Sequence, residues 1–299
     1  YRLRVTFNCS NLLAVPDAER HVAWHRMIDH FVYSAGATRD DRYAMCLSAL
    51  SNDPTESEFA SDFVVRDDRM LQYVAAGLFA WHTSANRGSD HFVRRLDALH
   101  PSRGGEALWR DESEMAHVAG EFSIDAAQSI VDMPHAFGWD DFALTPAQRE
   151  SMCRGMSLVS RSPLIIDSSS RRERSAVPHP LNWGRIIRAV IRCLDAADMR
   201  VDPQCKPWLE AWADQQPAEA VVAELRHLHY ESSKHRTGLP IDGWTFRVAL
   251  PEVIVVRGDS SPPSELHDTL NQALRAVCWL GLGQKTRLGF GQVILSREP

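Results

Sequence analysis

The chain has 299 residues, of which 44% are hydrophobic, enough to form two hydrophobic cores of ordinary size. Its formal net charge of -6 argues against a protein that holds nucleic acid by bulk electrostatic attraction. No apolar run approaches the roughly 20 residues of a membrane-spanning helix, and the six cysteines form no CxxC pair, which argues against a structural zinc site.

The first predicted element is a strand at the start of the chain, where apolar Leu3, Val5 and Phe7 alternate with polar residues. No apolar stretch typical of a secretory signal stands there, so we expect a cytoplasmic protein without a membrane segment. A helix is predicted from about residue 17 to 33. This β-then-α start is consistent with a ferredoxin-like domain, but residues 36–115 look mostly helical and would form a large insertion.

Charge is distributed unevenly along the chain. Residues 1–155 carry 15 basic and 23 acidic side chains, whereas residues 156–299 carry 18 and 16. Seven arginines lie between residues 161 and 192, together with only two acids. A local basic surface, rather than the net charge, is therefore the candidate for binding a phosphate backbone.

The second half has a clear order of predicted elements. They are a strand at 157–166, a helix at 181–197, strands at 224–230 and 244–250 joined by a polar segment, a helix from 262 to a stop at Gly281, and a strand at 292–295. This order, β-α-β-β-α-β, is that of the ferredoxin-like unit.

Four glycines with the spacing G-x-G-x5-G-x-G follow the last predicted helix, at Gly281, Gly283, Gly289 and Gly291. Without Cβ atoms their backbone can adopt positive φ, and consecutive N–H groups can converge on phosphate oxygens. Lys285 and Arg287 add cationic donors in the same loop. The P-loop and the dinucleotide-binding motif are excluded, because this segment follows a helix and its spacing differs. We therefore expect a phosphate-rich ligand.

The segment from Leu280 to Gly291 resembles the C-terminal glycine-rich signature of the RAMP superfamily of CRISPR systems, hydrophobic-G-hydrophobic-G-x5-G-hydrophobic-G. The order of elements in the second half is similar to that of the CRISPR repeat-RNA (pre-crRNA) processing endoribonucleases. The resemblance implies an α+β fold with two ferredoxin-like (RRM-like) domains in tandem. We expect them at 1–155, with the mostly helical insertion, and at 156–299, with the glycine-rich loop.

The resemblance also implies an endoribonuclease that uses neither a metal nor another cofactor. A ribose 2′-OH attacks the adjacent phosphate, which leaves a 2′,3′-cyclic phosphate and a 5′-OH. Repeat RNA or guide RNA with a stem-loop, and other CRISPR effector subunits, are the expected partners. The arginine bias and the divergent first half lead to the hypothesis of a type IV system. The alternatives are a non-catalytic RAMP subunit that binds guide RNA and a ferredoxin-like interaction module unrelated to RNA.

Titratable side chains are dense on the predicted helix 17–33, which makes it the first place to look for catalytic residues. His21 and His25 could act as general base or acid, and Arg26 could stabilise the pentavalent phosphate. His21, His25 and Asp29 share one helix face, but no motif such as HExxH accompanies them, so no metal site is expected. The alternative interpretation is a solvated helix face with incidental histidines.

Further cationic side chains are candidates for RNA contact, and the RNA would be held by its A-form backbone. They are Lys234, His235 and Arg236 in the predicted strand-connecting loop, Arg171, Arg172 and Arg174 in a second loop, and Arg185, Arg188 and Arg192 on one helix face. Arg236 is also a catalytic candidate. The alternatives are a charged hairpin tip and a solvated helix side. His227 and His229 are interpreted as a packing or hydrogen-bonding pair on one strand face.

Overall fold

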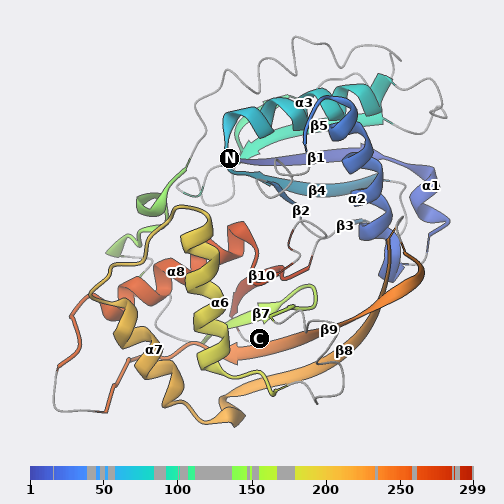
Figure 1. The fold of residues 1–299 in the computed structure, drawn as a ribbon. Helices are drawn as coiled ribbons and strands as arrows, with labels where there is room; N and C mark the ends of the chain where they lie inside the picture. The colour runs from blue at the N-terminus through green and yellow to red at the C-terminus, as the bar shows by residue number, and fades with distance from the viewer. Residues whose placement is uncertain are drawn as a thin grey trace. The chain divides into compact units, whose positions relative to one another are not determined.

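The chain forms two compact units, one within Tyr1–Phe137 and the other within Gly138–Thr286 and Phe290–Pro299 (Figure 1). The structure is a computed structural model that describes residues 1–15, 17–38, 45–47, 51–52, 58–83, 92–99, 101, 107–111, 137–146, 149, 155–166, 179–232, 235–257, 261–284, 286 and 290–297. Within these residues no helix is long and apolar enough to cross a membrane.

The first unit is built on an antiparallel sheet with the strand order β2-β4-β1-β5-β6, and β3 also pairs with β4. Its elements are β1 (Arg2–Asn8), α1 (Ser10–Leu13), α2 (Asp17–Ser34), β2 (Met45–Leu47), β3 (Ser51–Asn52), β4 (Glu58–Val65), α3 (Asp68–Thr83), β5 (Phe92–Leu99) and β6 (Ala107–Asp111). The succession β1-α2-β2-β4-α3-β5 is the β-α-β-β-α-β order of a ferredoxin-like unit.

The expected large, mostly helical insertion at residues 36–115 is therefore corrected. In the described part of that range α3 is the one helix, and strands β4 and β5 flank β1 in antiparallel register. These segments complete the first ferredoxin-like unit instead of interrupting it. Strand β4 gives a weak sequence signal because its polar Ser61 and Asp62 stand side by side, which breaks the alternation of apolar and polar residues.

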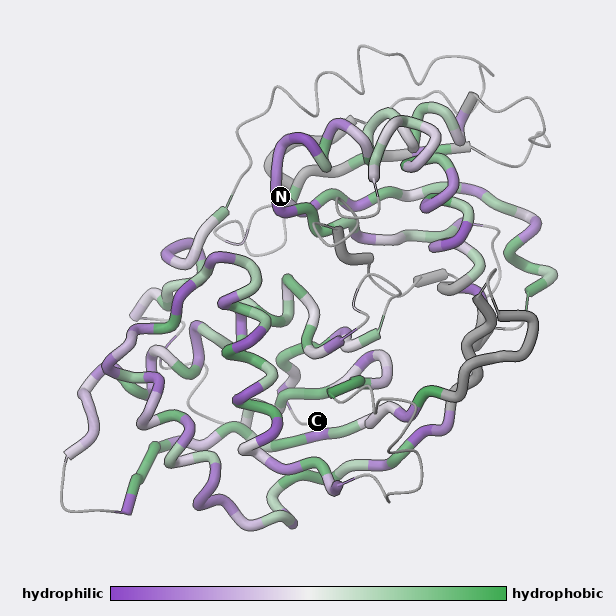
Figure 2. The backbone as a smooth tube through the Cα atoms, in the orientation of Figure 1, coloured by the Kyte–Doolittle hydropathy of each residue, from purple (hydrophilic) through white to green (hydrophobic). Residues whose placement is uncertain are grey.

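Strand β1 has one apolar face, which packs on the hydrophobic core of this unit, and one polar face. Hydrophobic and hydrophilic residues therefore alternate along it, as the colours of Figure 2 show. Leu3, Val5 and Phe7 are fully buried. Trp24 of α2 stacks on Phe7 with ring centroids 3.9 Å apart, and Trp81 of α3 meets Trp24 edge-on at 5.3 Å. Because large aromatic rings bury the most apolar area, this cluster forms the centre of the first core and fixes α2 and α3 on one face of the sheet.

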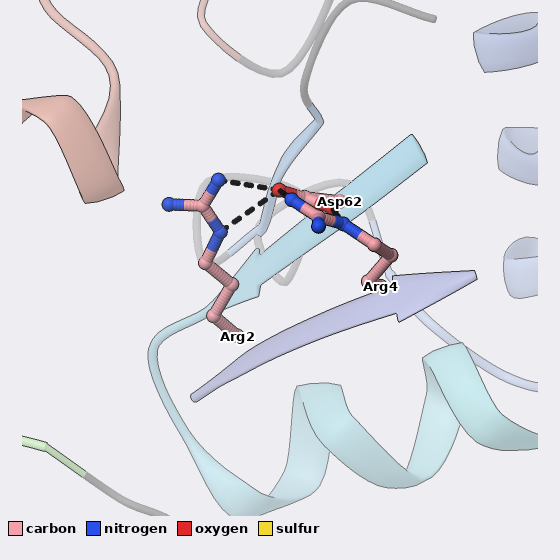
Figure 3. A network of polar contacts seen from close by, with 3 residues as sticks. All are labelled: Arg2, Arg4 and Asp62. Carbon is pink, nitrogen blue, oxygen red and sulfur yellow. Dashed lines mark hydrogen bonds and ion pairs between the residues drawn. The ribbon is translucent and has the colours of Figure 1, made fainter. Parts of the chain in front are cut away.

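The opposite face of β1 carries two arginines that converge on Asp62 of β4 (Figure 3). Arg4 lies directly opposite Asp62 in the register, and its Nε is 2.7 Å from Oδ1. Arg2 donates from Nε to Oδ2 at 3.0 Å and also from Nη2. Burial by itself would raise the pKa of the Asp62 carboxyl, but the charge of Arg2 and the hydrogen bond from Arg4 outweigh it and hold that pKa below its ordinary value.

The second unit has an antiparallel sheet with the order β10-β7-β9-β8. Its elements are η4 (Trp139–Phe142), β7 (Met156–Ser160), α6 (Trp183–Ala196), α7 (Lys206–Asp214), η5 (Ala218–Ala220), β8 (Val221–Ser232), β9 (His235–Ala249), α8 (Leu266–Leu280) and β10 (Val293–Arg297). The succession β7-α6-β8-β9-α8-β10 confirms the expected β-α-β-β-α-β order. Helix α7 is an addition that the sequence did not reveal, and it packs on α6 through Trp183 and Trp212, whose rings are 5.0 Å apart.

Side chains of α8 donate hydrogen bonds to the backbone of residues 139–143, which belong to the second unit. This unit therefore begins at Gly138, before the start of the domain expected at 156–299. Gln272 donates to the carbonyl oxygen of Trp139 at 2.8 Å. Arg275 donates to the carbonyl oxygens of Phe142 and Ala143 at 2.9 and 3.1 Å, and burial lowers the pKa of its guanidinium.

Strands β8 and β9 form one long hairpin where two shorter strands and a polar segment were expected. They pair from Val221 and Val248 down to Ser232 and His235. β7 pairs with β9 over Arg247–Ala249, and Leu164 bridges Trp244 further along β9. Beyond Trp244 the described pairings of the hairpin are those between β8 and β9, so this part is a two-stranded ribbon. Pro240 fits there because, among the described residues, no third strand requires the N–H group that proline lacks.

We predict that Asp62→Asn lowers the free energy of unfolding at pH 7 by about 3 kcal/mol, because two guanidinium groups then lie beside a neutral amide. The stabilisation that comes from the lowered pKa is present above the ordinary aspartate pKa of about 4, and it is lost as the pH falls through the lower folded-state value. Urea unfolding at pH 7 and at decreasing pH should therefore show the difference between the two proteins shrinking in acid.

The matched control is Glu58→Gln. Glu58 lies on the same strand as Asp62 and pairs with Arg94 of β5, but its side chain is 34% exposed. This exposed pair should contribute less than about 1 kcal/mol. Equal losses in the two variants would contradict the special role of Asp62.

Candidate functional site

The glycine-rich segment begins where α8 ends, as expected. Gly281 donates its N–H to the carbonyl oxygen of Val277 at 2.9 Å and has a φ of +81°, which terminates the helix. Gly283 and Gly291 also have positive φ, of +83° and +72°. A Cβ atom at Gly283 would lie 2.6 Å from the oxygen of Ile165, and one at Gly291 would lie 1.8 Å from the oxygen of Leu282. These glycines therefore let backbone segments touch.

Several N–H groups of this segment donate to carbonyl oxygens of the protein. Leu282 donates to Gly291 at 2.8 Å, Gln284 to Ile165 at 2.7 Å, and Gly291 to Pro163 at 2.9 Å. These groups are therefore not open to phosphate oxygens, which corrects the expected cradle of converging N–H groups at these positions. The RNA-binding role of the loop stays a prediction that depends on its cationic side chains. Lys285, Arg287 and also Gly289 lie outside the described residues.

Helix α2 presents its candidate catalytic residues in different directions. His25 is only 3% exposed, beside the first core, and its Nε2 is 3.9 Å from Oδ1 of Asp29. Arg26, one position and about 100° further round the helix, is exposed, and so is His30. The side chain of His21 is outside the described part of the chain. In this structure a ribose hydroxyl could reach Arg26, whereas the ring of His25 is closed off.

The expected row of arginines on α6 is partly used within the protein. Arg185 donates to the carbonyl oxygens of His179 and Pro180, beside the start of the helix. Arg188 pairs with Asp214 of α7 at 2.9 Å, and Arg192 is exposed. Arg188 and Arg192 are therefore the exposed members of this row, and the ion pair of Arg188 is itself solvent-exposed. The other members of the groove proposed for an RNA backbone, Arg171, Arg172 and Arg174, lie outside the described residues.

The β8–β9 hairpin positions a third group of candidates. Lys234 falls outside the described residues, and His235 and Arg236 begin β9 with side chains that are likewise not described. Further along the ribbon, His227 and Asp242 lie directly opposite each other, with Nδ1 and Oδ1 2.7 Å apart. Their side chains are 73% and 46% exposed. The strand pattern suggested His229 as the partner of His227. Asp242 was missed because a cross-strand partner follows from register, which one sequence does not supply.

The sequence placed His21, His25 and Asp29 on one face of α2 without the motif of a metal site. Within the described part of the chain, no group of three or more His, Cys, Asp or Glu side chains is arranged to bind a metal ion. Of His21, His25 and Asp29, the side chains of His25 and Asp29 are described. Their Nε2 and Oδ1 atoms are 3.9 Å apart.

No protein-family model matches the chain, and no curated protein matches it either. Among solved structures, the chain is similar to Cas6 from Thermus thermophilus, with a TM-score of 0.53 and 14% identity over 99% of this chain and 97% of that chain. A product complex of the same Cas6 aligns with a TM-score of 0.55, and a product complex of a second Cas6 aligns with 0.51. Both are 14% identical over 99% of this chain and 98% of theirs. At such identity the likeness shows a shared fold.

We predict that Gly291→Ala lowers the free energy of unfolding by about 3 kcal/mol or more, because the added Cβ would overlap the oxygen of Leu282 in a backbone held at positive φ. Urea unfolding of the purified variant measures the loss. The matched control is Gly155→Ala, where φ is +66° but a Cβ would meet nothing within 4 Å. It should cost only the backbone strain of about 1–2 kcal/mol. Similar losses for both would show that the loop has room for a side chain.

Proposed function

Because the chain has the fold of the Cas6 proteins, we propose that it binds CRISPR repeat RNA and cleaves it into mature guide RNA. The observation that carries this proposal is the extent of the likeness, which spans both ferredoxin-like units and 99% of the chain. Two of the similar structures are described as product complexes of Cas6. The glycine-rich signature from Leu280 to Gly291 is an independent support, because it comes from the sequence and not from the superposition.

The proposed reaction is the attack of a ribose 2′-OH on the adjacent phosphate, without a metal ion. Its transition state accumulates negative charge on the phosphorane oxygens, which guanidinium groups can stabilise by paired hydrogen bonds. Arg26 on α2 and Arg236 at the start of β9 are the proposed sources of that charge. His21 and His25 stay candidates for proton transfer, although His25 would have to become accessible first.

RNA binding is proposed for further cationic residues in the second half of the chain. Arg192 is exposed on α6, and the side chains of Lys234, His235, Lys285 and Arg287 would contact phosphate groups. We propose that the product stays bound and that the complex joins other CRISPR effector subunits in the cytoplasm. A type IV system is the proposed CRISPR subtype.

The burial of His25 favours a second candidate function. A RAMP subunit that binds guide RNA without cutting it needs the cationic surface but no accessible base. Both candidates predict RNA binding, so only the fate of the RNA separates them.

We predict that the purified protein converts its repeat RNA into a product with a 2′,3′-cyclic phosphate in the presence of EDTA, because an internal 2′-OH nucleophile needs no metal. The RNA is taken from the CRISPR repeats of the genome that encodes the chain, and gel analysis with phosphatase treatment identifies the ends. A 2′-deoxy nucleotide at the cut site should abolish cleavage and leave binding intact. Tight binding of an RNA that stays whole would support the non-catalytic subunit.

We predict that replacing Lys285 and Arg287 together by alanine weakens RNA binding and reduces the slope of log affinity against log salt by about 2, one for each lost phosphate contact. Filter binding or fluorescence anisotropy at several salt concentrations measures both quantities. Arg200→Ala is the control, because Arg200 is 82% exposed and lies outside the proposed contacts. Unchanged affinity and slope in the double variant would remove the loop from the RNA-binding surface.

A further inference from the structure

The described histidines differ in their capacity to accept a proton from a substrate. A general base needs an accessible ring nitrogen with a free lone pair. His25 and His82 are 3% and 2% exposed, and Nδ1 of His82 already accepts a backbone N–H. Both ring nitrogens of His267 have partners, since Nε2 is 3.1 Å from the oxygen of Pro251 and Nδ1 is 3.3 Å from Nδ2 of Asn271. None of these three fits the role as it stands.

His227 combines exposure with a carboxylate partner on one ring nitrogen, a combination that no other described histidine shows. Its side chain is 73% exposed, and its Nδ1 is 2.7 Å from the Asp242 carboxylate. An ionised carboxylate can only accept hydrogen bonds, so Nδ1 carries a proton, and in the neutral ring Nε2 therefore carries the lone pair. His30 and His179 are also exposed, but within the described residues no ion pair or hydrogen bond joins either ring to a carboxylate. The ring of His30 packs edge-to-face on Phe31, which does not select a tautomer.

The place of this pair in the fold suits contact with an extended ligand. His227 and Asp242 lie on the two-stranded ribbon, beyond Trp244, which is half-buried on the same face of β9. On the other face of the ribbon, Arg226 pairs with Glu224 at 2.7 Å. The strand that carries Asp242 begins with His235 and Arg236, and Arg236 stands six positions before Asp242, about 20 Å along an extended strand, so an extended ligand rather than a single phosphate would span both.

We propose that His227 is the general base of the RNA cleavage and that Asp242 is its positioning residue. This inference rests on the proposed function. Nε2 of neutral His227 takes the proton of the ribose 2′-OH while the 2′-oxygen forms a bond to phosphorus. The bond between phosphorus and the 5′-oxygen breaks, its electron pair stays on that oxygen, and the oxygen takes a proton from water. The imidazolium then returns its proton to solvent, which leaves a 2′,3′-cyclic phosphate and a 5′-OH.

Asp242 contributes in two ways to this step. Its carboxylate holds Nδ1–H, so that Nε2 stays available, and it stabilises the imidazolium that forms during the proton transfer. Asp242→Asn would remove the negative charge, and the amide N–H could instead donate to Nδ1. That arrangement selects the tautomer whose Nε2 carries a proton, which cannot act as a base.

The test is single-turnover cleavage of the repeat RNA at saturating protein, with binding measured separately on the 2′-deoxy RNA. His227→Ala should slow cleavage by about 100-fold or more and leave binding unchanged. Added imidazole should restore part of the rate, because it replaces the missing base. Asp242→Asn should slow cleavage without a change in binding, and imidazole should not restore it. Glu224→Gln is the matched control on the other face of the ribbon and should cleave at the wild-type rate.

A second substrate separates a base from an acid. RNA with sulfur in place of the 5′-oxygen has a leaving group that needs no protonation, so it would rescue a variant that lacks the general acid but not one that lacks the base. Rescue of His227→Ala by this RNA would overturn the proposed role. Equal cleavage rates of wild type and His227→Ala would overturn it as well and leave the proposed function intact. Intact RNA with the wild-type protein would overturn both.

Discussion

The second unit depends on the close approach of Gly291 to Leu282, where a side chain on the glycine would overlap a carbonyl oxygen. The hydrogen bond from Leu282 to Gly291 closes the segment between α8 and β10, and the bonds to Ile165 and Pro163 attach it to the chain that leaves β7. Three parts of the unit are thus held at one point. The positions of Gly283 and Gly291 are therefore a packing requirement, because a side chain at either would overlap a carbonyl oxygen.

The first unit is organised by the two faces of β1 instead. Phe7 and its neighbours pack on Trp24 and Trp81, while Arg2 and Arg4 close around the carboxylate of Asp62 on the other face. A buried carboxylate without these partners would be costly, and the two arginines make its ionised form the stable one. The apolar face decides where α2 lies. Because successive helix positions diverge by about 100°, packing Trp24 and His25 inward leaves Arg26 exposed.

The candidate catalytic and RNA-binding residues are distributed over several helices and strands. Some of their polar groups are already bound within the protein. Arg185 and Arg188 bind protein groups, and the N–H groups of the glycine-rich segment are satisfied internally. Among the candidates in the described part of the chain, Arg26, Arg188 and Arg192 have exposed side chains, and so do His227 and Asp242. This pair lies on a ribbon that projects from the sheet, where an extended ligand can reach it without displacing core residues.

Local sequence pattern by itself determined much of the second half. The periodicity of α6 and α8, the stop at Gly281 and the order β-α-β-β-α-β follow from side-chain alternation and from the φ that glycine permits, which are properties of short segments. Only the tertiary structure decided that residues 58–65 and 92–99 flank β1, that His25 points inward, and that Asp242 meets His227. Strand pairing and burial depend on contacts between residues far apart in the chain, and a single sequence does not say which of them meet.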